Sequence, residues 1–153
     1  RWDSLDKARE KIAYGISECD ILKISDNEIQ WFTGEQDFDR AVEILRGRYG
    51  NIKLLLLSLG KNGSRAYCGE NSAFAPAAPA NTIETTGAGD TFCGGILAKG
   101  LKYGLRNYSA EELTGILNYA NSAAGIVTER RGALKVMPSP AEINERMERI
   151  TND

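Results

Sequence analysis

Residues 52–59 constrain the fold more than any other segment of the 153-residue chain. They read Ile-Lys-Leu-Leu-Leu-Leu-Ser-Leu, a nearly continuous apolar run between Gly50-Asn51 and a glycine-containing turn at 60–63. A strand that is buried on both faces of a parallel sheet has this composition, whereas a strand with one solvated face alternates apolar and polar residues. The segment therefore predicts a central strand with helices on both sides of its sheet.

Helical and extended patterns alternate along the rest of the chain. Apolar residues recur at helical spacing, and a serine followed three positions later by a glutamate marks helix starts at Ser109 and Ser139. The expected elements are helices over residues 4–17, 37–48, 88–103, 109 to about 128 and from 140 onward, strands over 20–24 and 52–59, and a hairpin over 64–74. A further short helix is expected to be capped by Ser25 or Asp26 and to stop at Gly34. This alternation predicts a single α/β domain over residues 1–153. Its architecture should be three-layer αβα, with a mainly parallel sheet in the middle.

The charge and the histidine and cysteine content exclude several classes of protein. Nineteen basic and 21 acidic residues give a net charge of −2, which argues against a nucleic-acid binder, and no apolar run is long enough for a membrane span. Because the chain has no histidine, a Ser-His-Asp or Cys-His catalytic unit and a His-ligated zinc site are excluded. Three widely spaced cysteines form neither a disulfide framework nor a zinc ribbon, so free thiols of a cytoplasmic protein are expected.

The most informative motif is the glycine-rich helix start Gly87-Ala88-Gly89-Asp90. A glycine inside a helix costs about 1 kcal/mol relative to alanine, so glycines that cluster here require a reason. The first amides of a helix lack intrahelical partners and the helix dipole adds positive charge, so a phosphate can approach the bare backbone closely. These residues alone leave two interpretations open, a phosphate-binding turn and a purely structural helix start.

Asp90 favours a phosphoryl-transfer site over a simple binding turn. A carboxylate at a helix start is stabilised as the anion, and it can accept the proton of a hydroxyl group. An anion-binding turn beside a general base is the arrangement that phosphoryl transfer to an alcohol requires. A dinucleotide fingerprint is excluded because Phe92 stands at the position of its third glycine, and no window supplies the Gly-Lys-Ser/Thr of a Walker loop.

The segment Thr85-Thr86-Gly87-Ala88-Gly89-Asp90-Thr91-Phe92, followed by Gly94-Gly95, resembles the C-terminal signature of the ribokinase-like (PfkB) carbohydrate kinases. Three other segments fit this family in order, namely residues 23–34, residues 58–63 with the sequence Ser-Leu-Gly-Lys-Asn-Gly, and residues 120–139. The resemblance implies a ribokinase-like fold and the C-terminal, nucleotide-binding and catalytic portion of a sugar kinase. Arg1-Trp2 and the Lys-x-Ser sequence at 23–25 look most like fructokinases.

The resemblance also implies roles for individual residues. Asp90 would be the catalytic base on the sugar hydroxyl. Gly87, Ala88 and Gly89 would form the anion hole for the γ-phosphate. The implied nucleotide-binding residues are Ser58, Gly60, Gly63, Asn118 and Asn121.

Two positions depart from the family pattern. Glu28 matches the acidic residue of an Asn-x-x-Glu motif that acts on magnesium through water molecules, but Ser25 stands at the position of the asparagine. Glu84 stands where the family usually has an aspartate that helps to bind a monovalent cation. ATP and Mg²⁺ are therefore the implied cofactors, with K⁺ as a third that depends on Glu84.

The activity that the resemblance implies is ATP-dependent phosphorylation of a sugar hydroxyl, with fructose converted to fructose 6-phosphate. Two alternatives stay open: a ribokinase or nucleoside kinase of the same fold, and a nucleotide-binding fragment that is catalytically incomplete. We expect a small-molecule sugar substrate, no nucleic-acid or membrane partner, a cytoplasmic location, and a homodimer for the full-length enzyme.

Overall fold

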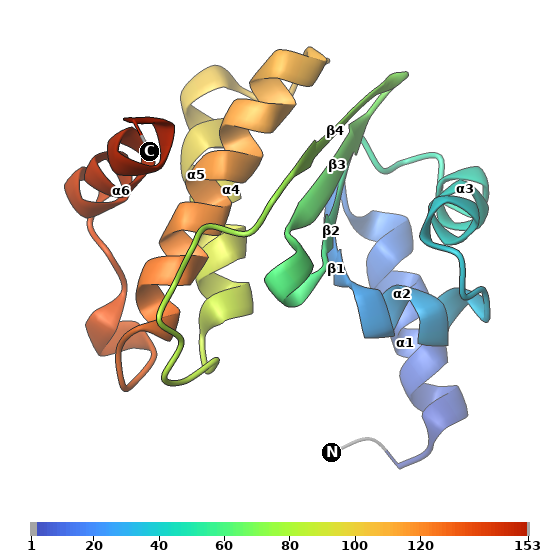
Figure 1. Ribbon diagram of the computed structural model, residues 1–153. Helices are drawn as coiled ribbons and strands as arrows, with labels where there is room; N and C mark the ends of the chain where they lie inside the picture. Colours follow the sequence, from blue (N-terminus) through green and yellow to red (C-terminus); the bar gives the residue numbers. More distant parts are fainter. Residues whose placement is uncertain (1–2, 153) are drawn as a thin grey trace.

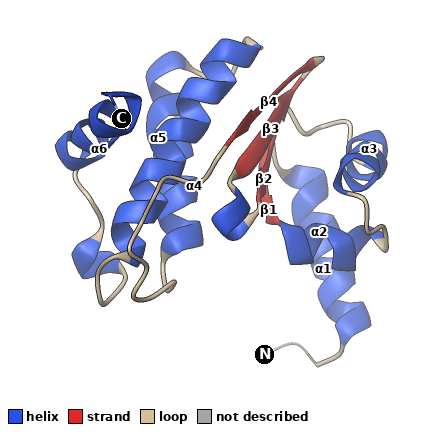
Figure 2. Cartoon of the chain, in the orientation of Figure 1, coloured by secondary structure: helices blue, strands red, loops and turns tan. Residues whose placement is uncertain are grey.

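The computed structural model describes residues 3–152, which form three layers (Figure 1). The helices α1 (Leu5–Glu18), α2 (Asp26–Thr33) and α3 (Phe38–Arg48) lie on one side of the β-sheet, and α4 (Ala88–Tyr103), α5 (Ala110–Thr128) and α6 (Pro140–Asn152) lie on the other. The sheet contains β1 (Ile21–Ser25), β2 (Leu54–Ser58), β3 (Ser64–Cys68) and β4 (Asn71–Ala75). The expected αβα layering is confirmed, as Figure 2 shows with helices on both sides of the strands.

The four strands form one mixed sheet in the order β1-β2-β3-β4. β1 and β2 are parallel, with Ser25 in register with Ser58, while β3 is antiparallel to β2 and β4 is antiparallel to β3. Three strands of this sheet therefore run in one direction, as expected of a mainly parallel sheet, but two of the three pairings are antiparallel. The short turn between β2 and β3 is the reason, because parallel neighbours need a much longer crossover connection.

Strand β2 is buried on both faces, which confirms the prediction from its apolar run. Leu54 and Leu56 belong to the core that the sheet forms with α4 and α5, whereas Leu55 and Leu57 belong to the core on the α1–α3 side. All four side chains are at most 1% exposed. Alternate residues of a strand point to opposite faces, so this one strand anchors both helical layers.

Helix α5 is the most deeply buried helix of the described chain. It packs against β3, β4, α4 and α6, and 12 of its 19 residues are buried. Its apolar residues therefore form a continuous surface between the sheet and the outermost helix.

Side-chain caps begin the two α-helices that follow α4 in sequence. The Ser109 hydroxyl accepts a hydrogen bond from the Glu112 amide at 3.2 Å, and the Glu112 carboxylate accepts one from the Ser109 amide at 2.9 Å, which confirms the capping box of α5. Ser139 and Glu142 form the same box at α6. Hydrogen bonds from the Ser139 amide and from Arg130 lower the pKa of Glu142 to about 2.

Several smaller expectations have mixed outcomes. The three cysteines are free thiols, as expected. The stretch between α5 and α6 contains a 3₁₀ turn over Leu134–Val136, which the sequence did not predict. Arg1-Trp2, which supported the fructokinase resemblance, lies outside the described residues. Within residues 3–152, no helix combines the length and the apolar character that crossing a bilayer requires.

Candidate active site

The candidate site lies at the carboxyl ends of the parallel strands β1 and β2. Ser25 and Ser58 are the last residues of these strands and lie opposite each other in the register. Ligands of open α/β sheets bind in the crevice outside the carboxyl ends of the strands. The sequence-predicted Ser58 is half-buried at this edge.

The start of α4 exposes backbone amides that no group within residues 3–152 satisfies. The N-cap Gly87 has a left-handed backbone with φ +82°, which favours glycine, and it supplies no side-chain cap. The first helical bond runs from the Thr91 amide to the Gly87 carbonyl, and the Ala88 amide donates to the Thr85 carbonyl at 3.1 Å. Among the described residues, the amides of Gly87, Gly89 and Asp90 have no such partner. The predicted anion hole therefore offers free donors at Gly87 and Gly89, while the amide of Ala88 is already engaged.

A cavity of about 480 Å³ opens at this helix start. Gly89 and Asp90 of α4 line it together with Lys23 of β1, and α1 forms the opposite wall. The Asp90 side chain is exposed to this cavity and has no ion-pair partner among the described residues. Its carboxylate is therefore free to accept a proton from a hydroxyl group that enters the cavity.

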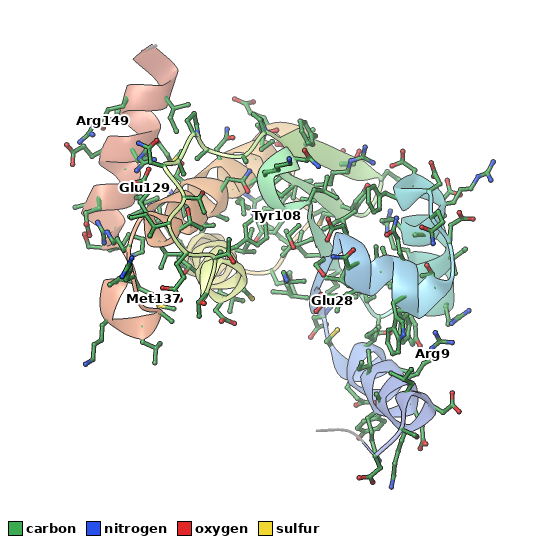
Figure 3. The ribbon with its side chains drawn as sticks, turned by 60° about the horizontal axis from the view of Figure 1, so that its bottom comes forward. Arg9, Glu28, Tyr108, Glu129, Met137 and Arg149 are labelled. Atoms are coloured by element: carbon green, nitrogen blue, oxygen red, sulfur yellow. The ribbon has the colours of Figure 1, made fainter. Side chains whose placement is uncertain are left out.

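Glu28 lies at the β1 end of α2 (Figure 3), where it completes a capping box with Ser25. Its carboxylate accepts a hydrogen bond from the Ser25 amide at 2.8 Å, and its Oε2 atom lies 4.0 Å from the Nζ atom of Lys23. Partial burial raises the pKa of Glu28, but the hydrogen bonds from Ser25 and the charge of Lys23 outweigh it and leave this pKa below its ordinary value. Glu28 is thus an anion with one oxygen committed to the helix start.

The turn over residues 58–63, which the sequence predicts to bind nucleotide, is linked to α5 through hydrogen bonds of Asn121. A Cβ atom on Gly63 would lie 2.2 Å from the Ala75 carbonyl oxygen, so close packing of backbone requires glycine there. Ser64, the next residue, donates a hydrogen bond to the Asn121 Oδ1 atom at 2.9 Å. The Asn121 amide nitrogen donates in turn to the carbonyls of Ala75 and Pro76. These bonds hold the turn, the segment after β4 and α5 in one arrangement.

The two asparagines line a second cavity, of about 340 Å³. Asn118 is half-buried there, and Asn121 is 8% exposed with its amide already hydrogen-bonded. The prolines Pro76 and Pro79 and the apolar residues Met147 and Ile150 complete the lining. This cavity shares no lining residue with the one at Asp90, and Gly60 lies exposed in the turn itself.

Glu84 lies near the loop that follows α5. Hydrogen bonds from Thr86 and from the Gly132 amide, the latter at 3.2 Å, hold the pKa of the Glu84 carboxyl below its usual range. The carboxylate is therefore charged and already receives donors, which a bound monovalent cation would have to displace or share. Within residues 3–152, no group of three or more acidic or cysteine side chains is arranged to hold a metal ion.

Lys23 is the residue of this site that sequence reasoning missed. It was considered only as part of a Lys-x-Ser sequence, yet its Nζ atom lies 3.6 Å from the position that a Cβ atom on Gly89 would occupy. The two residues are 66 positions apart in the chain. A lysine inside an otherwise apolar strand was the available signal, because strands of a sandwiched sheet rarely carry a charge.

Comparisons with known proteins find relatives in sequence and in fold. The chain is 30% identical over 151 residues to fructokinase-2 of Oryza sativa subsp. japonica, a match that covers 99% of this chain and 45% of the relative. A fructokinase of Xylella fastidiosa with bound ATP superposes with a TM-score of 0.86 at 19% identity, covering 98% of this chain and 49% of that one. An aminoimidazole riboside kinase of Salmonella enterica, complexed with its riboside and an ATP analogue, superposes with a TM-score of 0.80 at 27% identity, over 95% and 48% of the two chains.

The chain thus spans less than half the length of the relatives that it matches. The family described as "pfkB family carbohydrate kinase" matches residues 1–140 of this chain. These residues include the parallel strands β1 and β2, the start of α4 and the whole of α5. This chain belongs to the pfkB family of carbohydrate kinases.

Proposed function

We propose that this chain supplies the phosphate-donor side and the catalytic base of an ATP-dependent sugar kinase. The observation that carries the proposal is the position of Asp90 beside free helix amides in an open cavity. A pure nucleotide-binding module needs the amides but has no use for a base next to them. Membership of the family supports the same reaction.

The start of α4 would hold the terminal phosphate of ATP. The amides of Gly87 and Gly89 are unpaired, and the helix dipole places partial positive charge on them. In the proposed site the turn over Ser58, Gly60 and Gly63 and the cavity at Asn118 and Asn121 would receive the rest of the nucleotide. Ala88 would contribute its amide only if the bond to Thr85 opens.

Asp90 would take the proton from the sugar hydroxyl as that oxygen attacks the terminal phosphorus. Asp90 lies one residue after Gly89, so base and phosphate site share the same turn of helix. The loose transition state of phosphoryl transfer has little covalent chemistry, so positioning and charge stabilisation provide most of the rate enhancement.

The metal ions fit this site to different degrees. Glu28 has one carboxylate oxygen that is not bound to Ser25, so it could hold Mg²⁺ through a water molecule. Magnesium would neutralise charge on the phosphates during transfer. Glu84 is engaged by Thr86 and Gly132, and we assign no step to K⁺.

Fructose is the proposed acceptor, phosphorylated at its 6-hydroxyl, because the relatives that match over nearly the whole chain are fructokinases. A nucleoside or riboside acceptor is the second candidate, and the match to the riboside kinase favours it. A pocket that discriminates fructose from a nucleoside has to enclose the acceptor. The cavity between α1, β1 and α4 is open, so these elements alone do not enclose it.

Two measurements test the proposal, calorimetry of nucleotide binding and a coupled ADP-release assay. We expect residues 1–153 alone to bind adenine nucleotide weakly and to phosphorylate no sugar, because they carry the donor side without a closed acceptor pocket. A coupled ADP-release assay on this chain, with its mass verified, and on the native protein would use fructose, ribose and nucleosides in parallel. Absence of any nucleotide binding would contradict the proposal, and fructose phosphorylation by residues 1–153 alone would show that the acceptor pocket is complete within them.

A further inference from the structure

Lys23 occupies an unusual position for a lysine. It lies in the middle of β1, between Leu22 and Ile24, and its side chain is only 22% exposed. Lysine is mostly an exposed residue, and where a strand covers most of its stem the ammonium group is usually paired or turned to a polar surface. The position therefore calls for an anionic partner.

The anionic partner of Lys23 in the structure is Glu28, and the ion pair between them is weak. Glu28 Oε2 lies 4.0 Å from Lys23 Nζ, at the outer limit of an ion pair, and the same oxygen accepts the Ser25 amide at 2.8 Å. The Glu28 side chain is itself 62% exposed, so solvent screens the pair. Glu28 holds the ammonium group in place but compensates its charge incompletely.

The Lys23 ammonium group also faces the positive end of a helix. Its Nζ atom lies 3.6 Å from the Cβ position of Gly89, whose amide is unpaired, and both residues line the 480 Å³ cavity. A cation beside a helix N-terminus is unfavourable on its own. An anion between them would satisfy both, and the Asp90 carboxylate, although nearby, forms no ion pair with Lys23 in the described chain.

We propose that Lys23 is a catalytic residue that binds the outermost phosphate of the nucleotide, opposite the amides of α4. This inference rests on the proposed function. As the transfer proceeds, the sugar oxygen bonds to the γ-phosphorus, the bond to the β–γ bridging oxygen breaks, and ADP leaves with that electron pair. The hydroxyl proton goes to Asp90, and Lys23 stays protonated and offsets the charge on the moving group.

The test compares nucleotide affinities of Lys23→Met, Lys23→Arg and Lys53→Met by calorimetry on the 153-residue chain. Lys53 is a matched control, because it is an exposed lysine paired with Asp20 at 2.8 Å outside the cavity. Methionine preserves the length of the buried stem of Lys23, and a urea denaturation curve of each variant verifies folding.

We expect Lys23→Met to weaken ATP binding by about 10- to 100-fold, the value of a hydrogen bond to a charged group. ADP should lose less and AMP nothing, Lys23→Arg should retain more affinity than Lys23→Met, and Lys53→Met should match the unmodified chain. Equal ATP affinity of Lys23→Met and the unmodified chain, or equal losses for ATP and AMP, would overturn the role of Lys23. If the unmodified chain binds neither ATP nor ADP, the proposed function fails as well.

Discussion

The starts of α4 and α5 differ in how their first backbone amides are satisfied. At α5, Ser109 and Glu112 satisfy two of the unpaired amides through a reciprocal capping box. At α4, Gly87 has no side chain to offer, and the amides of Gly89 and Asp90 stay free. Both helices pack against each other in the same layer, but their starts lie at opposite ends of it, because only residues 104–109 separate the end of α4 from the start of α5.

The contrast shows where the chain gives up stability. A side-chain cap contributes about 1 kcal/mol to a helix start, and the sequence uses one at α1, α2, α3, α5 and α6. Within residues 3–152, α4 is the only α-helix whose start lacks a side-chain cap, and this start faces an open cavity that the exposed Asp90 and the half-buried Lys23 also line. An unsatisfied helix end in that place is the feature on which the proposed phosphate site depends.

The largest effect at either helix start is expected from Asp90→Asn in the native protein. Loss of the base should lower the rate of sugar phosphorylation by about 10²- to 10⁴-fold while ATP affinity stays nearly unchanged, because the amides of α4 remain. A coupled assay and calorimetry separate the two effects. Asp6→Asn, at an exposed position on α1, serves as the control, and an Asp90→Asn variant that keeps more than about a tenth of the activity would show that Asp90 is not the base.

A smaller effect is expected from Gly89→Val, which fills the free helix start with a side chain. The new Cβ atom would lie 3.6 Å from Lys23 Nζ, where a phosphate would bind, so ATP affinity should fall by roughly 10- to 100-fold. Gly94→Val is the matched control, because it lies in the same helix with open space around its Cβ position. Equal ATP affinity of the two variants in calorimetry would contradict the anion-hole assignment.

The smallest effect should come from the capped helix. Ser109→Ala should lower the free energy of unfolding by about 1 kcal/mol, because the Glu112 amide loses its acceptor, and it should leave ATP affinity unchanged. Urea denaturation measures the stability, and Ser109→Asp should restore most of it, since aspartate caps as well as serine. A change in nucleotide affinity would show that the two helix starts are coupled.

Local signals in the sequence predicted most of the fold. The bounds of α4 and the capping boxes at Ser109 and Ser139 followed from short-range patterns that the structure preserves. Ser25 was one of two expected caps of α2, and the structure adds the reciprocal bond from Glu28, which has the same spacing as in the other boxes. The antiparallel pairing of β3 with β4 is the predicted hairpin, whereas the antiparallel pairing of this hairpin with β2 was not predicted, although the short turn between β2 and β3 favours it.

The candidate site was predictable only where its residues are consecutive. Gly87 to Asp90 form one turn of helix, so their proximity is inherent in the sequence. The approach of Lys23 to Gly89 depends on β1 lying beside the start of α4, a tertiary contact between segments 66 positions apart. Similarly, only the packed structure shows that the Asn121 amide is occupied by Ser64 and the carbonyls after β4.

The burial of α5 has a consequence for how the molecule fluctuates. Because α5 lies against the sheet, α4 and α6, its central amides can meet water only when these contacts separate together. Such an opening approaches complete unfolding, so the exchange of these amide hydrogens reports the global stability of the chain. The free amides at Gly87 and Gly89 need no opening to exchange. One helical layer therefore contains the slowest and the fastest expected amide exchange, in the centre of α5 and at the start of α4.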